Sequence, residues 1–260
     1  MHEHGLSLHL EANGTELLFD LGQTSFFAQN AERLGVDLSA ATLAVISHGH
    51  YDHGGGLARF LEINRSAPVY LCRGADGAFH AGPRGSRYIG LNRGVLAAHR
   101  ERMKWLDSDM EVARGVHLLT RIPGQEPRPA GNLHLMVRRG GELVRDDFAH
   151  ELFCVIEEDD GMTVITGCGH SGIANMLLAT RKRFPGRSLK AVVGGLHLMD
   201  GKGSDGPDVE GTGSLLRALV GQERAKVVTG HCTEEGAMDL LEEGLGDRLM
   251  RMNTGMTIGL

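Results

Sequence analysis

The side chains with the clearest capacity for chemistry stand between Ser47 and Leu57, in the segment SHGHYDHGGGL. Four metal-binding residues fall within six positions, in the pattern H-x-H-x-D-H: His48, His50, Asp52 and His53. Imidazole and carboxylate ligands without clustered thiolates favour zinc, iron or manganese over a Cys-rich structural zinc site. We therefore predict a site for one or two divalent metal ions, with zinc preferred over manganese or iron. The alternative is a polar loop that is rich in histidine by chance.

A buried strand is expected to position the side chains of this motif. The apolar run from Thr42 to Ile46 precedes it, and a glycine triplet at 54–56 follows it. Alternate side chains of an extended chain point the same way, so His48 and His50 can bind one ion. The next two ligands then lie on the following turn of chain, placed for a second ion. The glycines allow the backbone to bend close to the site.

Three later loops also carry a histidine directly after an apolar run. Ligands in α/β proteins gather beyond the carboxyl ends of strands, so these loops are expected at the same edge as the first motif. We predict His170 and His231 as metal ligands, and His197 as either a ligand or a catalytic residue that contacts the substrate. The loops are TGCGHSG at 166–172, GGLHL at 194–198 and TGHCT at 229–233.

Acidic residues near these motifs have two interpretations. Asp20 ends the run Leu18-Phe19-Asp20, where its carboxylate can orient a metal-binding imidazole or simply form an Asx turn. His150 lies between Asp147 and Glu151 and is a weaker candidate ligand. We expect the acidic side chains around it, Asp146 included, at the solvated surface.

Composition limits the functions open to the chain. Its 260 residues are 41% hydrophobic and 23% charged, which is typical of a globular protein with one substantial core. A net charge of −6 provides no basic field for nucleic acid, and no apolar run is long enough to span a membrane. The expected partner is a small-molecule substrate, with no nucleic acid and no membrane.

Cysteine usage and the N-terminus predict a reducing, cytoplasmic setting. The four cysteines form no C-x-x-C pair and their spacing is not that of a disulfide framework. The segment from Met1 to Gly5 does not resemble a signal peptide. The cysteines are Cys72, Cys154, Cys168 and Cys232.

One domain over residues 1–260 is expected, built from alternating strands and helices. Asn13-Gly14 predicts a hairpin between strands at 6–10 and 16–19. Further strands are predicted at 42–46, 68–72, 115–120, 152–156, 163–166, 189–193, 226–229 and 256–258, and helices at 25–34, 56–64, 173–183, 213–221 and 234–243.

Residues 73–109 break this pattern. Apolar periodicity is weak there and glycine and arginine are frequent, so we predict an irregular excursion outside the core. Its arginines could clamp a phosphate or carboxylate group, or lie in solvent. They are Arg84, Arg87, Arg93, Arg100 and Arg102.

These motifs together resemble the metallo-β-lactamase superfamily. Within it they resemble the branch of 7,8-dihydropterin-6-methyl-4-(β-D-ribofuranosyl)aminobenzene-5′-phosphate synthase-like proteins, over nearly the whole chain. The resemblance implies an α+β fold, a four-layer αββα sandwich with a one- or two-metal site at one edge. It rests on EHGLS at 3–7, FDLGQ at 19–23, LGVDLS at 34–39, the segment 47–57, GCGHSGIAN at 167–175, GGLHL at 194–198 and HCT at 231–233.

The resemblance also implies how the ligands divide. His48, His50 and His170 are expected at one metal, whereas Asp52, His53 and His231 form or complete a second. Cys168 stands where most of the superfamily has an Asp that bridges two metals, so the bridge is either missing or made by a thiolate. Asp52 is a candidate general base if it is not a ligand.

The leading hypothesis is a metalloenzyme that uses metal-activated water or Lewis-acid chemistry on a small substrate, phosphorylated or pterin-like. The branch implies a pterin-linked condensation as one named activity, which would make the chain a transferase. One alternative is a general hydrolase of esters, lactones or phosphodiesters. An alternative of another class is a di-iron redox or metal-sensing protein.

Overall fold

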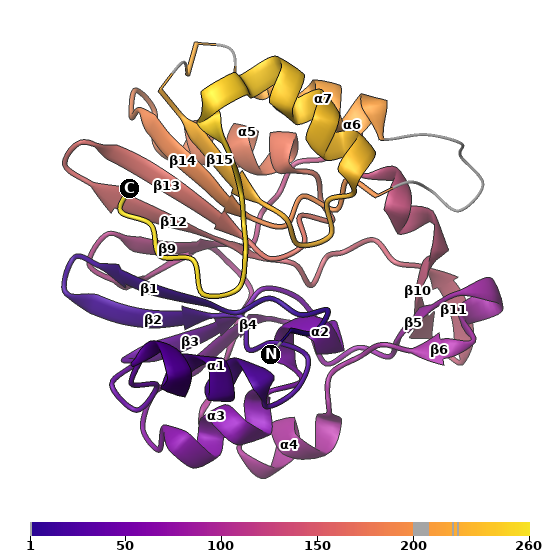
Figure 1. Cartoon of the computed structure of the whole chain (residues 1–260). Coiled ribbons are helices and arrows are strands. Elements are labelled where there is room, and N and C mark those ends of the chain that lie inside the picture. The colour runs from indigo at the N-terminus through magenta and orange to yellow at the C-terminus, as the bar shows by residue number, and fades with distance from the viewer. Residues whose placement is uncertain (1, 200–207, 220, 223) are drawn as a thin grey trace. The chain divides into compact units, whose positions relative to one another are not determined.

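The computed structural model describes residues 2–199, 208–219, 221–222 and 224–260. Contacts divide the chain into two compact units. The first unit holds Met1–Ser108 and Leu135–Leu152, and the second holds Asp109–His134 and Phe153–Leu260. Each unit has its own sheet with helices packed on one face of it (Figure 1). The single domain expected from the sequence stays a prediction.

The main sheet of the first unit has the strand order β1-β2-β3-β4-β7. β1 and β2 are antiparallel, whereas β2, β3, β4 and β7 run parallel. The bounds are β1 Leu8–Ala12, β2 Thr15–Phe19, β3 Leu43–Ile46, β4 Val69–Cys72 and β7 Met103–Leu106.

The predicted hairpin joins β1 and β2. Ala12 pairs with Thr15, and the two residues between them have positive φ: 52° at Asn13 and 78° at Gly14. A two-residue turn with both φ angles positive suits the twist of antiparallel strands, which confirms the Asn-Gly prediction.

Helices α1, α3 and α4 cover this sheet (Figure 1). Phe27, Phe60 and Leu61 from α1 and α3 share one apolar core with residues of β2, β3 and β4. The predicted end of α1 at Gly35 is confirmed, because Gly35 adopts the left-handed conformation that closes a helix. The bounds are α1 Phe26–Leu34, α2 Tyr51–Gly54, α3 Leu57–Ile63 and α4 Arg93–Ala98.

Residues 73–109 are not an irregular excursion, and that prediction is wrong. They contain α4 and β7, and β7 joins the main sheet beside β4 with Met103 and Leu106 buried. Their remaining strands, β5 and β6, belong to a small four-stranded sheet of the order β11-β10-β5-β6, in which β5 pairs with β10 and β6 pairs with β5. Strands of two to four residues are too short to show periodicity in a sequence. The bounds are β5 Phe79–Ala81, η1 Pro83–Gly85, β6 Arg87–Tyr88, β10 Leu135–Arg139 and β11 Glu142–Arg145.

The sheet of the second unit has the order β16-β15-β14-β13-β12-β9-β8. β13, β14, β15 and β16 run parallel, so their carboxyl ends lie at one edge of this sheet. The expected last strand at 256–258 is wrong, because β16 lies earlier. The bounds are β8 Met110–Ala113, β9 Val116–Leu119, β12 Phe153–Glu158, β13 Gly161–Thr166, β14 Leu189–Gly194, β15 Lys226–Thr229 and β16 Leu249–Arg251.

Helices α5, α6 and α7 cover the second sheet (Figure 1) and share a core with it. α5 has the predicted bounds. α6 begins earlier than expected because the Asp208 side chain caps it by accepting from the Gly211 N–H, and the expected end at 220–221 lies partly outside the described residues. The bounds are α5 Ile173–Arg183, α6 Val209–Ala218, α7 Glu235–Leu245, η2 Ala130–His134 and η3 Gly246–Arg248.

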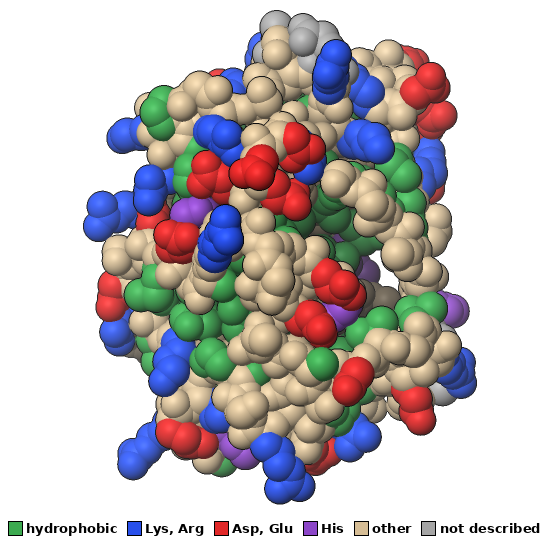
Figure 2. Space-filling model, turned by 90° about the vertical axis from the view of Figure 1, so that its left-hand side faces the viewer, with side chains coloured by type: hydrophobic (Ala, Val, Ile, Leu, Met, Phe, Trp, Pro, Cys, Tyr) green, Lys and Arg blue, Asp and Glu red, His purple; other side chains and the backbone are tan. Residues whose placement is uncertain are grey.

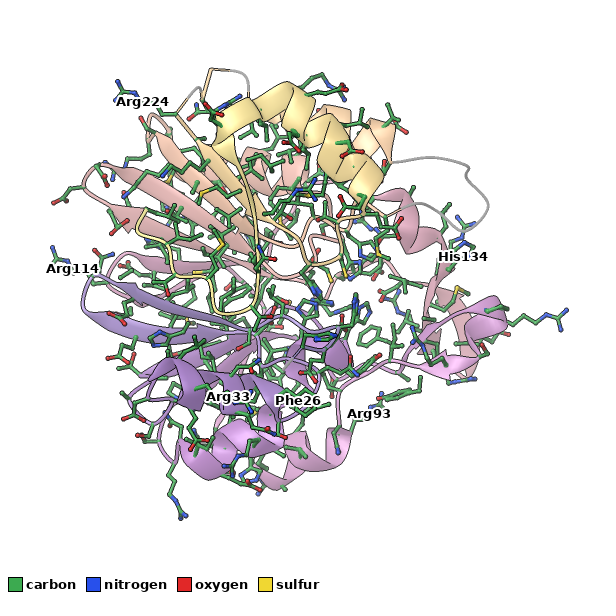
Figure 3. The ribbon with its side chains drawn as sticks, viewed as in Figure 1. Phe26, Arg33, Arg93, Arg114, His134 and Arg224 are labelled. Carbon is green, nitrogen blue, oxygen red and sulfur yellow. The ribbon has the colours of Figure 1, made fainter. Side chains whose placement is uncertain are left out.

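Surface charge agrees with the composition. On the face drawn in Figure 2, side chains of both signs are interspersed among the described residues without a continuous basic area. Arg114 and Arg224 extend outward from their backbone (Figure 3). Among the described residues, no helix combines the length and hydropathy needed to cross a membrane.

Candidate metal centre

The first motif leaves the end of β3 and enters the one-turn helix α2. Backbone pairing holds its start, because the Leu152 N–H donates to the Ser47 carbonyl. The residue between His48 and His50 must be glycine, because a Cβ on Gly49 would stand 2.2 Å from Phe79 and 2.5 Å from the Ala75 carbonyl oxygen. The four predicted ligands of this motif are all buried, with exposed fractions of 0% for His48, 4% for His50, 8% for Asp52 and 0% for His53.

Asp20 orients two of these histidines. Its Oδ2 lies 2.6 Å from His53 Nδ1 and accepts from the Ser47 hydroxyl at 2.8 Å, while Oδ1 accepts from the Ser47 N–H at 2.7 Å. Because the Ser47 hydroxyl donates to Asp20, its oxygen accepts from His48 Nδ1, 2.9 Å away. Both imidazoles therefore carry their proton on Nδ1, which leaves Nε2 as the metal-binding atom of each.

The other two predicted ligands of the first unit lie beside these. His48 Nε2 is 3.1 Å from His50 Nδ1, a separation that suits two nitrogens bound to one ion at about 2.1 Å each. Asp52 Oδ2 is 3.5 Å from His53 Nε2 and 3.7 Å from His4 Nε2. The donor set therefore fits a divalent metal of the zinc, iron or manganese type.

His150 holds the backbone of the motif in place through a hydrogen bond. Its Nδ1 accepts from the Gly49 N–H at 3.1 Å, and its Nε2 lies 3.0 Å from Asp146 Oδ2, so both ring nitrogens are engaged. Asp146 and Glu151 are buried, and the expectation that they lie at the solvated surface is wrong for both. Tertiary packing buries a segment whose own sequence is polar.

The second unit supplies the other predicted residues from the loops after β13, β14 and β15. Glycine allows these loops to touch: the Gly195 N–H donates to the Gly167 carbonyl, and a Cβ on Gly195 would stand 2.5 Å from that oxygen. His170, which is 1% exposed, is fixed by Asn132, whose Oδ1 lies 2.8 Å from His170 Nδ1 and whose Nδ2 donates to the His170 carbonyl. His170 therefore presents Nε2.

Two thiols and two imidazoles gather in the same loops. Cys168 Sγ lies 3.5 Å from His231 Nε2 and 3.6 Å from Cys232 Sγ, and Cys232 Sγ lies 3.3 Å from His231 Nε2. The hydrogen bond from Cys168 and the nearby His231 hold the pKa of Cys232 well below its usual value, against the effect of burial. A ring nitrogen of His197 lies within 4.8 Å of both sulfur atoms.

Each unit thus brings together its own share of the predicted site. Asp20 and the four motif residues meet in the first unit, and Cys168 meets His197 and His231 in the second. Their division between two metals stays a prediction. Sequence reasoning missed Ser47, Asn132 and Cys232. Only Cys232 had a visible signal, its position directly after a predicted ligand.

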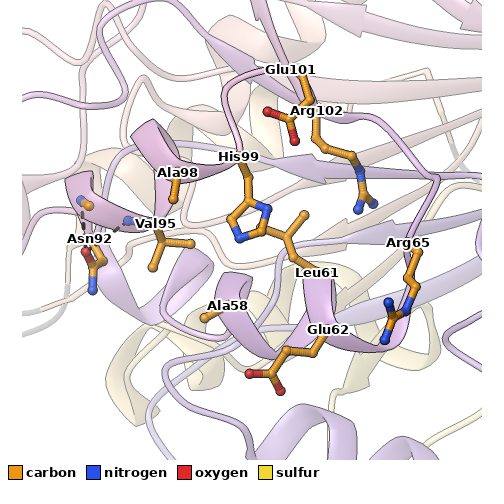
Figure 4. A pocket seen from close by; sticks show the side chains of 11 residues that line it. Ala58, Leu61, Glu62, Arg65, Asn92, Val95, Ala98, His99, Glu101 and Arg102 are labelled. Carbon is orange, nitrogen blue, oxygen red and sulfur yellow. Dashed lines mark hydrogen bonds between the residues drawn. The ribbon is translucent and has the colours of Figure 1, made fainter.

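A separate groove of about 640 Å³ lies between α3 and α4 (Figure 4). Glu62, Arg65, Glu101 and Arg102 give its wall mixed charge. Arg102 donates to the carbonyls of Asn64 and Ala67, so its guanidinium stabilises the chain before β4. None of the predicted metal-binding or catalytic residues is among the described residues that line this groove.

Comparison with known proteins identifies the family. Residues 4–231 match the model of the metallo-β-lactamase superfamily, and the chain belongs to that superfamily. It is 27% identical over 274 residues to the 7,8-dihydropterin-6-methyl-4-(β-D-ribofuranosyl)-aminobenzene-5′-phosphate synthase of Methanocaldococcus jannaschii, covering 98% of this chain and 90% of that protein. The resemblance found in the sequence is thereby confirmed.

Solved structures agree. A metal-dependent hydrolase of the β-lactamase superfamily is 31% identical, with a TM-score of 0.82, and the match covers 99% of this chain and 92% of that one. An isothiocyanate hydrolase from Delia radicum gut bacteria shares the fold at 17% identity and a TM-score of 0.57, covering 98% and 97%. The predicted fold class, an α+β sandwich of the metallo-β-lactamase type, is confirmed.

Proposed function

We propose that this chain is a metal-dependent enzyme that binds one or two divalent ions, zinc before manganese or iron. The proposed ligands are His48, His50, Asp52 and His53 of the first unit and His170 and His231 of the second. The observation that carries the proposal is the orientation of His48 and His53 by Asp20, because metal-binding histidines need such a partner on the other ring nitrogen. A bound ion of this kind lowers the pKa of water toward neutrality and polarises the attacked group.

The protein's own groups supply the remaining functions. Asp52 is the proposed general base when it does not bind metal, since its carboxylate is buried close to two imidazoles. His197 is proposed to contact the substrate. Both of its ring nitrogens are buried and make no hydrogen bond of regular geometry among the described residues, although the imidazole interacts with the Cys232 thiol, so a polar group of a ligand would complete their hydrogen bonding.

The proposed substrate is small and phosphorylated or pterin-like. The pterin-phosphate synthase of M. jannaschii supports this choice, because it matches this chain over nearly its whole length. A general hydrolase of esters, lactones or phosphodiesters is the second candidate, favoured by the metal-dependent hydrolase that is 31% identical. A di-iron redox or metal-sensing protein would hold iron and absorb visible light.

Substrate turnover separates these candidates. The purified chain, with its metal content measured, is assayed with a ribosylaminobenzene phosphate plus a dihydropterin that carries a leaving group on its 6-methyl carbon, and in parallel with generic phosphodiesters, esters and lactones. Formation of the joined pterin product, lost in His48→Ala, supports the transferase. Turnover of the generic substrates alone overturns the pterin proposal and leaves the hydrolase. Bound iron with dioxygen consumption and neither turnover contradicts both.

A further inference from the structure

We propose that Cys168, Cys232 and His231 bind one zinc ion directly, through two thiolates and one imidazole, with His197 beside the remaining position. This inference rests on the proposed metal function and deepens it. Cys168 becomes a direct ligand rather than a substitute for a bridging carboxylate, and Cys232 becomes a ligand that the sequence motifs did not indicate.

The distances carry the inference. Zinc binds sulfur at about 2.3 Å and nitrogen at about 2.0–2.1 Å, so tetrahedral ligands stand roughly 3.4–3.8 Å from one another. The three separations here are 3.6 Å between the sulfurs and 3.5 Å and 3.3 Å from each sulfur to His231 Nε2. The three donor atoms therefore already form one face of a zinc tetrahedron.

His197 provides an independent observation that points to a ligand. It is 6% exposed, and its ring nitrogens make no hydrogen bond of regular geometry among the described residues; its imidazole interacts with the Cys232 thiol, and one ring nitrogen lies within 4.8 Å of both sulfurs. A buried polar group without a well-formed hydrogen bond lowers the stability of the fold unless a polar atom or an ion lies within bonding distance of it. A zinc ion with three protein ligands keeps a fourth position open, as catalytic zinc sites do.

Backbone conformation supports the same placement. Cys232 and His197 both have a φ of 48°, in the left-handed region that residues other than glycine rarely adopt. Such a conformation is strained and persists where the surrounding structure imposes it, often at functional sites. Here it accompanies the two loops that bring Cys232 and His197 to Cys168.

Metal uptake at this site has a defined proton balance. Each thiol that is still protonated releases its proton to solvent as its bond to zinc forms. No electron is transferred, so the site must assemble with both cysteines reduced. Thiolate donors favour zinc over manganese or magnesium, which prefer oxygen ligands.

Cobalt substitution tests the ligands without relying on activity. The full chain is stripped with a chelator under reductant and titrated with Co²⁺, and the near-ultraviolet charge-transfer absorption of cobalt–thiolate bonds is recorded. We expect this absorption in the wild type, and a loss of about half of it in Cys232→Ser and in Cys168→Ser, because each removes one of two thiolates. Cys154→Ser is the matched control, since Cys154 is a buried thiol within β12 whose pKa burial raises to about 12.

A second measurement covers the case in which Cys168→Ser does not fold. Wild-type protein is alkylated with and without zinc, and each cysteine is quantified by mass spectrometry. Zinc is expected to slow alkylation of Cys232, the more exposed of the two thiols, at least tenfold while leaving Cys72 unchanged. Equal alkylation rates of Cys232 with and without zinc would overturn the proposal, as would full charge-transfer absorption in Cys232→Ser.

The outcomes are separable from those of the proposed function. If His50→Ala loses metal while wild type shows no cobalt–thiolate absorption, the metalloenzyme proposal stands and the thiolate ligands are wrong. If His50→Ala keeps all of its metal while each cysteine variant loses about half of the absorption, the thiolate site stands and the first motif does not bind metal.

Discussion

Asp20 Oδ2 lies 2.6 Å from His53 Nδ1, and both side chains are fully buried. The same carboxylate accepts from the Ser47 hydroxyl, whose oxygen stands 2.9 Å from His48 Nδ1. One carboxylate at the end of β2 thus fixes two imidazoles, that of His48 just after the neighbouring strand β3 and that of His53 in helix α2. Parallel pairing of these strands brings the two ends together, and the buried setting leaves the interaction unscreened by solvent.

Asp20→Asn is expected to weaken metal binding by about 10–100-fold. The amide offers one oxygen where the carboxylate offers two, so its NH₂ group must face a donor, either the Ser47 N–H or His53 Nδ1. A chelator competition titration measures the change. Asp37→Asn is the control, because Asp37 is exposed and its carboxylate only closes a turn to Ser39. Wild-type affinity in Asp20→Asn would refute the positioning role.

Gly55→Ala is expected to destabilise the fold by about 2–3 kcal/mol or to shift the motif. Gly55 has φ −64°, so the cost is steric: a Cβ would stand 2.0 Å from the Gln23 carbonyl oxygen and 2.5 Å from that of Tyr51. Gly124→Ala, where a Cβ meets nothing within 4 Å, should change the free energy of unfolding little. Urea denaturation of both variants decides, and equal stabilities would contradict the packing described.

Asn132→Ala is expected to lower metal affinity by about tenfold while the fold remains. The change removes the group that holds His170 Nδ1, so the imidazole loses its fixed tautomer and orientation. Isothermal titration with zinc and thermal unfolding measure the two effects. Asn253→Ala, at an exposed position near the C-terminus, is the control. Unchanged zinc affinity in Asn132→Ala would argue against His170 as a ligand.

The Arg139–Asp147 ion pair predicts a small dependence of stability on pH. The hydrogen bond from Arg139 lowers the pKa of Asp147 to about 2. The contribution of the Asp147 carboxylate to the free energy of unfolding is therefore present above the unfolded pKa of about 3.9 and is lost as pH falls through about 2. Both side chains are half-exposed, so Asp147→Asn should cost under about 1 kcal/mol at neutral pH. Urea denaturation of the metal-free protein should show this difference shrinking below about pH 4 and in high salt. A difference that grew on acidification would contradict the assignment.

Local signals explain what the sequence could predict. The bounds of α5 were predictable because Gly172 and Pro185 limit it on both sides, and the first motif was predictable because four ligands follow one apolar strand. Asp20 was predictable as a partner for a histidine because it ends a strand. Its contact with His53 depends on the pairing of β2 with β3.

Features set by long-range packing were not predictable. Met103 and Leu106 lie in a four-residue strand whose place beside β4 is fixed by tertiary pairing. Its own sequence is too short to show a strand pattern, and an irregular segment was therefore predicted there. Asp146 is buried against His150, and nothing in its polar neighbourhood indicated this. Cys232 meets Cys168 across 64 residues of chain, which leaves no spacing motif.

The metal content of His50→Ala tests the central claim most directly. Elemental analysis of purified wild type should give one or two ions per chain, and His50→Ala should lose the ion that the first motif binds, whereas an ion held by Cys168, Cys232 and His231 should remain. His134→Ala, at an exposed position labelled in Figure 3, should keep the wild-type content. A His50→Ala protein that is folded and holds as much metal as the wild type would show that the H-x-H-x-D-H motif is not the metal site.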